Sequence, residues 1–181
     1  MTKQVLFIQG GGNNGYEADA KMVASLRNEL GDPYHVHYPK LASNESAPDY
    51  GWLKQIRKEM DAINGDVILA AHSFGASMLL KFLSENKIKK HITGIFLIAT
   101  AFWSGDEDWQ QGFKLKKDFG ERLPENVPVF LYHCLDDEEV PFKHLSIYKK
   151  NLPKATVREI AGGGHLLNND LAIVAKDIKN L

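Results

Sequence analysis

The sequence predicts an α/β fold, a single-domain three-layer α/β/α sandwich around a mostly parallel sheet of about six strands. Short apolar runs rich in branched residues alternate along the chain with amphipathic stretches of helical period. This alternation is typical of strand–helix–strand units with right-handed crossovers. Several of the runs are continuously apolar, which indicates strands covered on both faces. The 181 residues contain no internal repeat and no long linker, so we expect one domain over residues 1–181.

The expected strands are the apolar runs that end in glycine, proline or a polar break. In chain order they are Val5–Gln9, His35–Tyr38, Asp66–Ala71, Ile92–Thr100, Pro128–Cys134 and Ala155–Ile160. The expected helices place their apolar residues on one side, at helical spacing. They are Glu17–Leu30, Tyr50–Ile63, Gly75–Glu85 and Asn168–Leu181.

One stretch, Ala101–Asn126, fits neither pattern. It is charged, rich in aromatic residues and lies between two expected strands. We interpret it as a short cap-like excursion over the carboxyl edge of the sheet, because open α/β sheets bind ligands at that edge. Its Phe102, Trp103 and Trp109 would then line a substrate pocket together with Gly12. The alternative is a surface helix whose aromatic side chains only pack down onto the sheet.

Composition and charge argue against several classes of function. The formal net charge is -1, whereas nucleic-acid grooves and binders of anionic membranes carry excess positive charge. Cys134 is the single cysteine, so neither an intrachain disulfide nor a multi-cysteine zinc site can form. The apolar run at the N-terminus is too short for a signal sequence or a membrane span. We therefore expect a cytoplasmic protein with no metal and no cofactor.

The pentapeptide Ala71-His72-Ser73-Phe74-Gly75 carries the sharpest chemical signal. It follows an expected strand and precedes an expected helix, and a serine on such a tight turn is strained and exposed above the sheet. The turn needs small residues two places before and two places after the serine, as Ala71 and Gly75 provide. The helix N-terminus also directs partial positive charge toward the serine oxygen. The alternative is a serine that only caps the helix.

A serine hydroxyl needs a base, and the base needs an orienting acid. Two later loops supply both, each directly after an expected strand and therefore at the same edge as Ser73. The first begins with Asp136 and Asp137, and the second places His165 after three glycines that allow the loop to curl back. The other six histidines have no such setting, and we interpret them as structural or surface residues. We expect the side chain of His72 to point away from the pocket.

A glycine-rich loop, Gly10–Gly15, follows the first expected strand. Acyl transfer creates an oxyanion, which two backbone N–H groups commonly stabilise. We expect Phe74 and Gly11 to supply them. The same glycines also match a dinucleotide-binding fingerprint. That alternative is disfavoured because the second strand ends in Pro39-Lys40, where an acid would bind the ribose.

Together these motifs resemble those of the serine hydrolases of the α/β-hydrolase fold. The resemblance is greatest to the small family typified by retinoblastoma-binding protein 9 and the bacterial YdeN-type hydrolases. It rests on the loop Gly10–Gly15, the turn Ala71–Gly75, the motif Asp137-Glu138-Glu139-Val140-Pro141, and Gly164-His165 before the last helix. These motifs extend over essentially the whole chain, and their order is more specific than any one of them.

The resemblance implies that Ser73 is the nucleophile, His165 the base and acid, and Asp137 the orienting acid, with Asp136 as the alternative acid. It implies hydrolysis of a small-molecule carboxylic ester, or of an amide or thioester, through an acyl-enzyme. Ala71 departs from the usual glycine of the turn, and Gln9 departs from the histidine that often precedes the oxyanion loop. The second hypothesis is a catalytically weak scaffold that binds a ligand or a protein partner.

Overall fold

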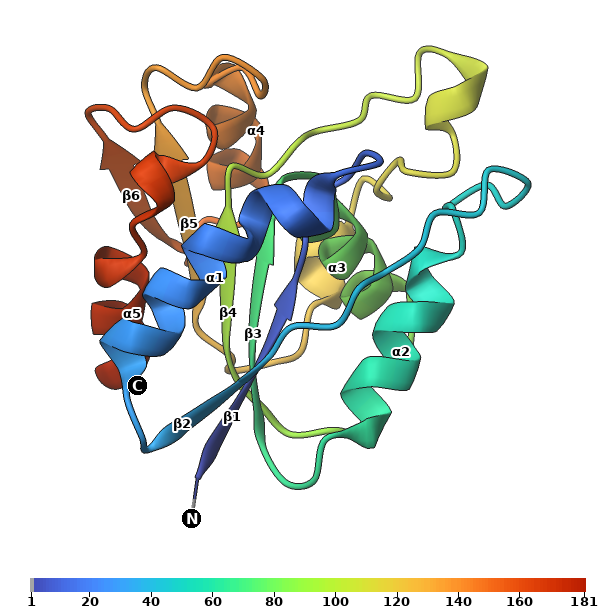
Figure 1. Cartoon of the computed structure of the whole chain (residues 1–181). Helices are drawn as coiled ribbons and strands as arrows, with labels where there is room; N and C mark the ends of the chain where they lie inside the picture. Colours follow the sequence, from blue (N-terminus) through green and yellow to red (C-terminus); the bar gives the residue numbers. More distant parts are fainter. Residues whose placement is uncertain (1) are drawn as a thin grey trace.

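The computed structural model describes residues 2–181 and contains one six-stranded sheet (Figure 1). Its strands run in the spatial order β2-β1-β3-β4-β5-β6, and every neighbouring pair is parallel. The strands are β1 (Lys3–Ile8), β2 (Tyr34–His37), β3 (Val67–His72), β4 (Ile92–Ile98), β5 (Val129–Cys134) and β6 (Thr156–Ile160). The predicted α/β sandwich with a sheet of about six strands is therefore confirmed.

Helices cover both faces of the sheet and complete the three layers. One face carries α1 (Gly15–Leu30) and α5 (Ala172–Lys179), which pack against each other. The other face carries α2 (Trp52–Ala62), α3 (Ser73–Glu85) and α4 (Lys143–Asn151). Because right-handed crossovers keep all strands parallel, their carboxyl ends meet at one edge, at the top of Figure 1.

The central strands are buried on both faces, which explains their continuous apolar sequences. Every residue of β3 is buried, and the last four residues of β1 are fully enclosed. Side chains of alternate direction enter two separate cores, one under α1 and α5 and one under α2, α3 and α4. Packing on both faces holds β1 and β3 in place, and with them the loops that follow each strand at the carboxyl edge.

Two helices differ from the sequence-based expectation. Helix α4 is absent from it because the helix is short and buries only Leu145 and Tyr148, too few apolar residues for a clear period. The last helix begins later than expected, since Leu167, Asn168 and Asn169 all have positive φ and form a separate 3₁₀ turn, η3. A left-handed backbone cannot continue a right-handed helix.

The segment 101–126 contains two 3₁₀ turns, η1 (Asp108–Gln110) and η2 (Phe119–Arg122), and no α-helix. The alternative of a surface helix is therefore wrong, although Phe113 and Phe119 do pack into the core. A side chain at Gly112 would collide with the carbonyl oxygen of Pro48, so the segment lies tightly against the loop before α2. Figure 1 shows these two loops together at the upper right.

Among residues 2–181, no helix combines the length and the apolar character needed to cross a bilayer.

Candidate active site

The turn between β3 and α3 has the strained geometry that its sequence predicts. Ser73 is the first residue of α3 and has a φ of 53°, a value that non-glycine residues rarely adopt. A Cβ on Gly75 would lie 2.0 Å from the carbonyl oxygen of Gln9, so only glycine allows β1 to approach this closely. The helix therefore begins in contact with the end of the neighbouring strand.

The structure brings together Ser73, Asp137 and His165, which lie far apart in the sequence. His165 Nε2 lies 3.0 Å from Ser73 Oγ. On the other side of the ring, Nδ1 lies 3.0 Å from both carboxylate oxygens of Asp137. The three side chains form one continuous set of hydrogen-bonding contacts at the carboxyl edge of the sheet. This is the arrangement in which an imidazole can take the proton of a serine hydroxyl.

Asp137 is held as an ionised acceptor. Its side chain is fully buried, and its Oδ1 accepts hydrogen bonds from the N–H groups of Glu139 and Val140. Burial acts to raise the pKa of this carboxyl, but the hydrogen bonds from Val140 and His165 outweigh it and leave the pKa below its ordinary value. A carboxylate facing Nδ1 fixes the tautomer in which Nε2 is free to accept a proton.

Asp136, the alternative acid, contacts the loop before His165. Its carboxylate accepts hydrogen bonds from the N–H groups of Gly163 and Gly164, at 3.1 and 2.9 Å. The same bonds lower its pKa, with the Gly164 bond as the larger cause. Glu138 similarly accepts from the backbone N–H of His165. Sequence reasoning missed these contacts of Asp136 and Glu138, because a run of acidic residues does not indicate which loop its side chains contact.

The fourth acid of the run, Glu139, has a different position. Its side chain is 67% exposed, and its carboxylate lies 3.6 Å from His165 Nε2. It lines the cleft above Ser73, and among residues 2–181 the lining includes no lysine or arginine. Glu139 therefore places an exposed carboxylate at the cleft.

The cleft above Ser73 has a volume of about 280 Å³. Its walls come from the glycine loop, the turn at Ser73, and the loops that carry Glu139 and His165. Gly12 lies in this wall. Gly11 lines the cleft too and packs directly on Phe74, since a Cβ at Gly11 would lie 2.9 Å from the Phe74 Cβ. Phe74 is in the first turn of α3, where N–H groups have no intrahelical acceptor.

The three aromatic residues predicted for the substrate pocket do not line this cleft. The backbone N–H of Phe102 donates to His144 Nδ1, and Trp103 packs against Phe74 with ring centroids 6.0 Å apart. Trp109 is 53% exposed and contacts Trp103 edge to face. The aromatic cluster therefore packs against Phe74 outside the cleft lining, and its segment lies against the loop before α2 through Gly112.

The expectation that His72 points away from the pocket is wrong. His72 is buried and is among the residues that line the cleft, and its ring lies 4.6 Å from the ring of His165, centroid to centroid. Sequence reasoning also missed Asp19, which lines the cleft from α1. The only signal that could have indicated His72 is its position next to the nucleophile.

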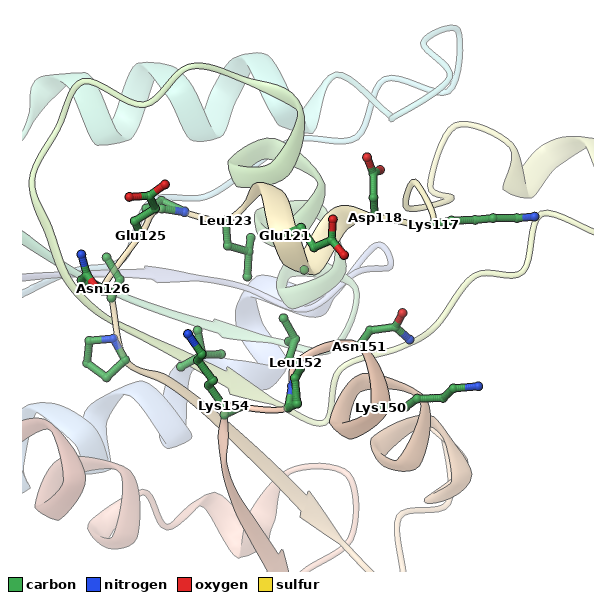
Figure 2. A pocket seen from close by; sticks show the side chains of 17 residues that line it. Lys117, Asp118, Glu121, Leu123, Glu125, Asn126, Lys150, Asn151, Leu152 and Lys154 are labelled. Atoms are coloured by element: carbon green, nitrogen blue, oxygen red, sulfur yellow. The ribbon is translucent and has the colours of Figure 1, made fainter.

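A second, larger hollow of about 950 Å³ lies at the opposite edge of the sheet (Figure 2). Its lining comes from the segments that precede β5 and β6 and from the end of α4. Figure 2 shows Glu121 and Glu125 on one side and Lys150 and Lys154 on the other. Its lining includes none of Ser73, Asp137 and His165, so the smaller cleft above Ser73 is the candidate active site.

Within residues 2–181, no group of three or more histidine, cysteine, aspartate or glutamate side chains is placed to hold a metal ion. The neighbouring His35 and His37 contact each other at 2.9 Å, and His37 also contacts Gln4.

The chain matches known proteins in sequence pattern and in fold. A family model described as serine hydrolase matches residues 26–170. No curated protein matches the chain in sequence. Among solved structures, the ydeN gene product of B. subtilis is 20% identical, with a TM-score of 0.73 and coverage of 99% of this chain and 98% of that chain.

Two further structures show the same fold at lower identity. One, from work on carboxylesterases of Nitrososphaera gargenis, is 13% identical with a TM-score of 0.71, covering 99% of this chain and 89% of that chain. The other, mouse alpha/beta hydrolase domain-containing protein 10, is 18% identical with a TM-score of 0.69 and the same two coverages. The predicted resemblance to YdeN-type α/β hydrolases is thus confirmed.

Proposed function

The chain belongs to the serine hydrolase family, and on this premise we propose that it hydrolyses small carboxylic esters through an acyl-enzyme on Ser73. One observation carries the proposal: Ser73 Oγ, the His165 imidazole and the Asp137 carboxylate are joined by contacts of 3.0 Å. Removal of the serine proton by a base that a buried carboxylate orients is the established route to a nucleophilic hydroxyl.

In the first half of the reaction, Ser73 Oγ attacks the ester carbonyl while His165 Nε2 takes the hydroxyl proton. Asp137 stabilises the imidazolium that forms. The carbonyl oxygen becomes an oxyanion, which the backbone N–H groups of Phe74 and Gly11 stabilise. Each such donor typically contributes about 3–4 kcal/mol to lowering the barrier. The intermediate then collapses, and the alcohol leaves with the proton from His165.

In the second half, a water molecule replaces the alcohol. His165 Nε2 takes a proton from the water as its oxygen attacks the acyl carbon, and the same two N–H groups stabilise the second oxyanion. Collapse breaks the bond to Ser73 Oγ, which recovers its proton from His165. The products are one carboxylic acid and one alcohol, and the enzyme returns to its starting state.

The size of the cleft supports short acyl groups. About 280 Å³ lies just below the usual range for small-molecule pockets, and three adjacent glycines form part of the wall. The aromatic residues of the 101–126 segment, which would extend an apolar acyl channel, stand outside it. The same attack would cleave an amide or a thioester, so the leaving group has to be varied experimentally.

The test is hydrolysis of p-nitrophenyl acetate, butyrate and octanoate by the wild type and by Ser73→Ala. We expect turnover that falls as the acyl chain lengthens, and its loss in the variant. Ser104→Ala, at an exposed serine of the 101–126 segment, is the control and should keep full activity. Undiminished turnover by Ser73→Ala would refute the assignment, and preference for octanoate would refute the size argument. Matched amide and thioester substrates define the leaving group.

A second candidate function is a catalytically weak scaffold that binds a protein or ligand. The observation that favours it is the exposure of Trp109 at a site away from the catalytic cleft. A fluorophosphonate probe separates the two functions, because it reacts with an activated serine whether or not the natural substrate is known. Labelling of Ser73 supports the hydrolase, whereas an inert serine in folded protein supports the scaffold.

A further inference from the structure

A buried carboxylate–imidazole pair lies directly beneath the catalytic cleft. Asp19, on α1, and His72, the last residue of β3, are each only 2% exposed in their side chains. Asp19 Oδ1 lies 2.9 Å from His72 Nδ1. Neither side chain belongs to the Ser73–His165–Asp137 set. Polar side chains are costly to remove from water, so the burial of these two next to a reaction site calls for an explanation beyond stability.

The carboxylate of this pair also holds the glycine loop. Asp19 Oδ2 accepts a hydrogen bond of 2.7 Å from the backbone N–H of Gly10. Gly10 directly precedes Gly11, the expected second oxyanion donor. The packing here is tight, since a Cβ on Gly10 would lie 3.1 Å from His72 Nδ1. Asp19 therefore fixes the start of the loop against the residue before the nucleophile.

The imidazole of the pair holds the loop that carries the base. His72 Nε2 lies 3.0 Å from the backbone carbonyl oxygen of His165. A carbonyl oxygen only accepts, so Nε2 must carry the hydrogen of this bond. His72 is joined through the backbone to Ser73, so the same residue links the nucleophile to the base.

The pair reaches two loops at once. Asp19 accepts from the N–H of Gly10 in the oxyanion loop, and His72 Nε2 contacts the carbonyl oxygen of His165 in the base loop.

We propose that Asp19 and His72 are positioning residues that hold the Gly10–Gly15 loop and the His165 loop in register with Ser73. The inference rests on the proposed function. Neither residue touches the reacting atoms. Both act through others: Asp19 sets the place of the Gly11 N–H through Gly10, and His72 sets the place of the His165 ring through its backbone. Since displacement of a catalytic group by about 1 Å can cost about 100-fold in rate, loss of either contact should reduce kcat.

The test compares Asp19→Ala with Asp19→Asn. Alanine removes both contacts, so we expect kcat for p-nitrophenyl acetate to fall about 100-fold, while KM changes little. An asparagine oxygen can still accept from Gly10, and its NH₂ group can face His72 Nδ1. The Nε2 hydrogen of His72 then remains on the His165 carbonyl. We therefore expect Asp19→Asn to recover most of kcat.

Asp177→Ala is the matched control. Asp177 is also a buried carboxylate with two partners, Tyr132 and Arg158, but it lies on α5, outside the cleft lining. Its loss should lower the melting temperature and leave kcat of the folded protein unchanged. Asp19→Ala with full kcat, or with a loss that Asp19→Asn does not reverse, would overturn the proposal.

If Asp19→Ala does not fold, His72→Gln provides the same readout, because a glutamine amide cannot contact both Asp19 and the His165 carbonyl in place of the imidazole. A selective fall in kcat supports the proposal, and an unchanged kcat overturns it. Failure of the proposed function is distinguishable: the wild type would then neither hydrolyse esters nor react with a fluorophosphonate. An active wild type with an equally active Asp19→Ala variant would refute the positioning role and leave the proposed hydrolase function standing.

Discussion

The paired substitutions Asp137→Asn and Asp136→Asn test which acid orients the base. Asparagine has nearly the same shape as aspartate, so both variants should keep the fold. In Asp137→Asn the imidazolium that forms during attack loses its buried counter-charge, which lies 3.0 Å from Nδ1. In Asp136→Asn the amide oxygen can still accept from one of the two glycine N–H groups that Asp136 binds.

The size of the Asp137 effect follows from Coulomb's law. At 3.0 Å and an effective dielectric constant of about 20, the attraction between the two charges is about 5 kcal/mol. Since each 1.36 kcal/mol corresponds to a tenfold change in rate, kcat should fall by about 10³–10⁴. The result should resemble loss of the correct histidine tautomer in serine proteases, which costs about 10⁴. Asp136→Asn should lose less than about tenfold, because only a loop contact weakens.

The assay is steady-state hydrolysis of p-nitrophenyl acetate, with melting temperatures measured to show that each variant is folded. Retention of more than about a tenth of the wild-type kcat by Asp137→Asn would refute the reasoning from charge. A larger loss in Asp136→Asn than in Asp137→Asn would instead move the orienting role to Asp136.

Four other outcomes are expected. Gly75→Ala places a Cβ 2.0 Å from the Gln9 oxygen, so urea unfolding should show a loss of about 1–3 kcal/mol, and an unchanged stability would contradict the close approach. Burial raises the pKa of the Cys134 thiol to about 11, so a thiol reagent at pH 8 should label it only in unfolded protein; fast labelling of the native state would contradict this. The pKa of Asp136 is lowered in the folded state, so its ionised form stabilises the fold above about pH 4. This stability should be lost as the pH falls further, less so in Asp136→Asn, and identical pH profiles of unfolding would count against it. Glu139→Gln should reduce the preference for acetylcholine over its uncharged dimethylbutyl isostere by about two- to fivefold, as expected for an exposed charge. An unchanged ratio of kcat/KM for the two esters would argue against a role of Glu139 in selectivity.

The nucleophile turn was predictable from the sequence because its constraints are local. A serine forced to positive φ between a strand and a helix requires small neighbours, and Gly75 meets this need at a position where any side chain would collide. The edge at which the loops lie also follows from the sequence pattern. Parallel strands place all their carboxyl ends at one edge of the sheet, so the loops carrying Asp137 and His165 lie at the same edge as Ser73.

The contacts of Asp19 were not predictable for the opposite reason. In the sequence, Asp19 lies at helical spacing from Met22 and Val23 on the apolar face of the helix, but nothing local shows which groups its carboxylate contacts. Its burial arises only when α1 packs beside the end of β3, more than fifty residues later in the chain. A single sequence carries no record of such a pairing.

The prediction that three aromatic residues line the pocket was wrong for a related reason. Phe102, Trp103 and Trp109 do not line the cleft, although Trp103 contacts Phe74, the residue after the nucleophile. Gly112 of this segment packs against the carbonyl oxygen of Pro48, a contact that composition and spacing do not encode. A hydrophobic pattern predicts that a segment packs against the rest of the protein, but it does not predict which neighbour the segment contacts.

Trapping of the reaction intermediate tests the central claim most directly. Wild-type protein mixed with p-nitrophenyl acetate, acid-quenched within the first turnovers and digested, should yield the peptide of Ser73 carrying one acetyl group. His165→Ala should yield the same peptide unmodified, because its serine keeps its proton. Continued ester turnover with the acetyl group on another residue, or equal acetylation of Ser73 without His165, would contradict the account.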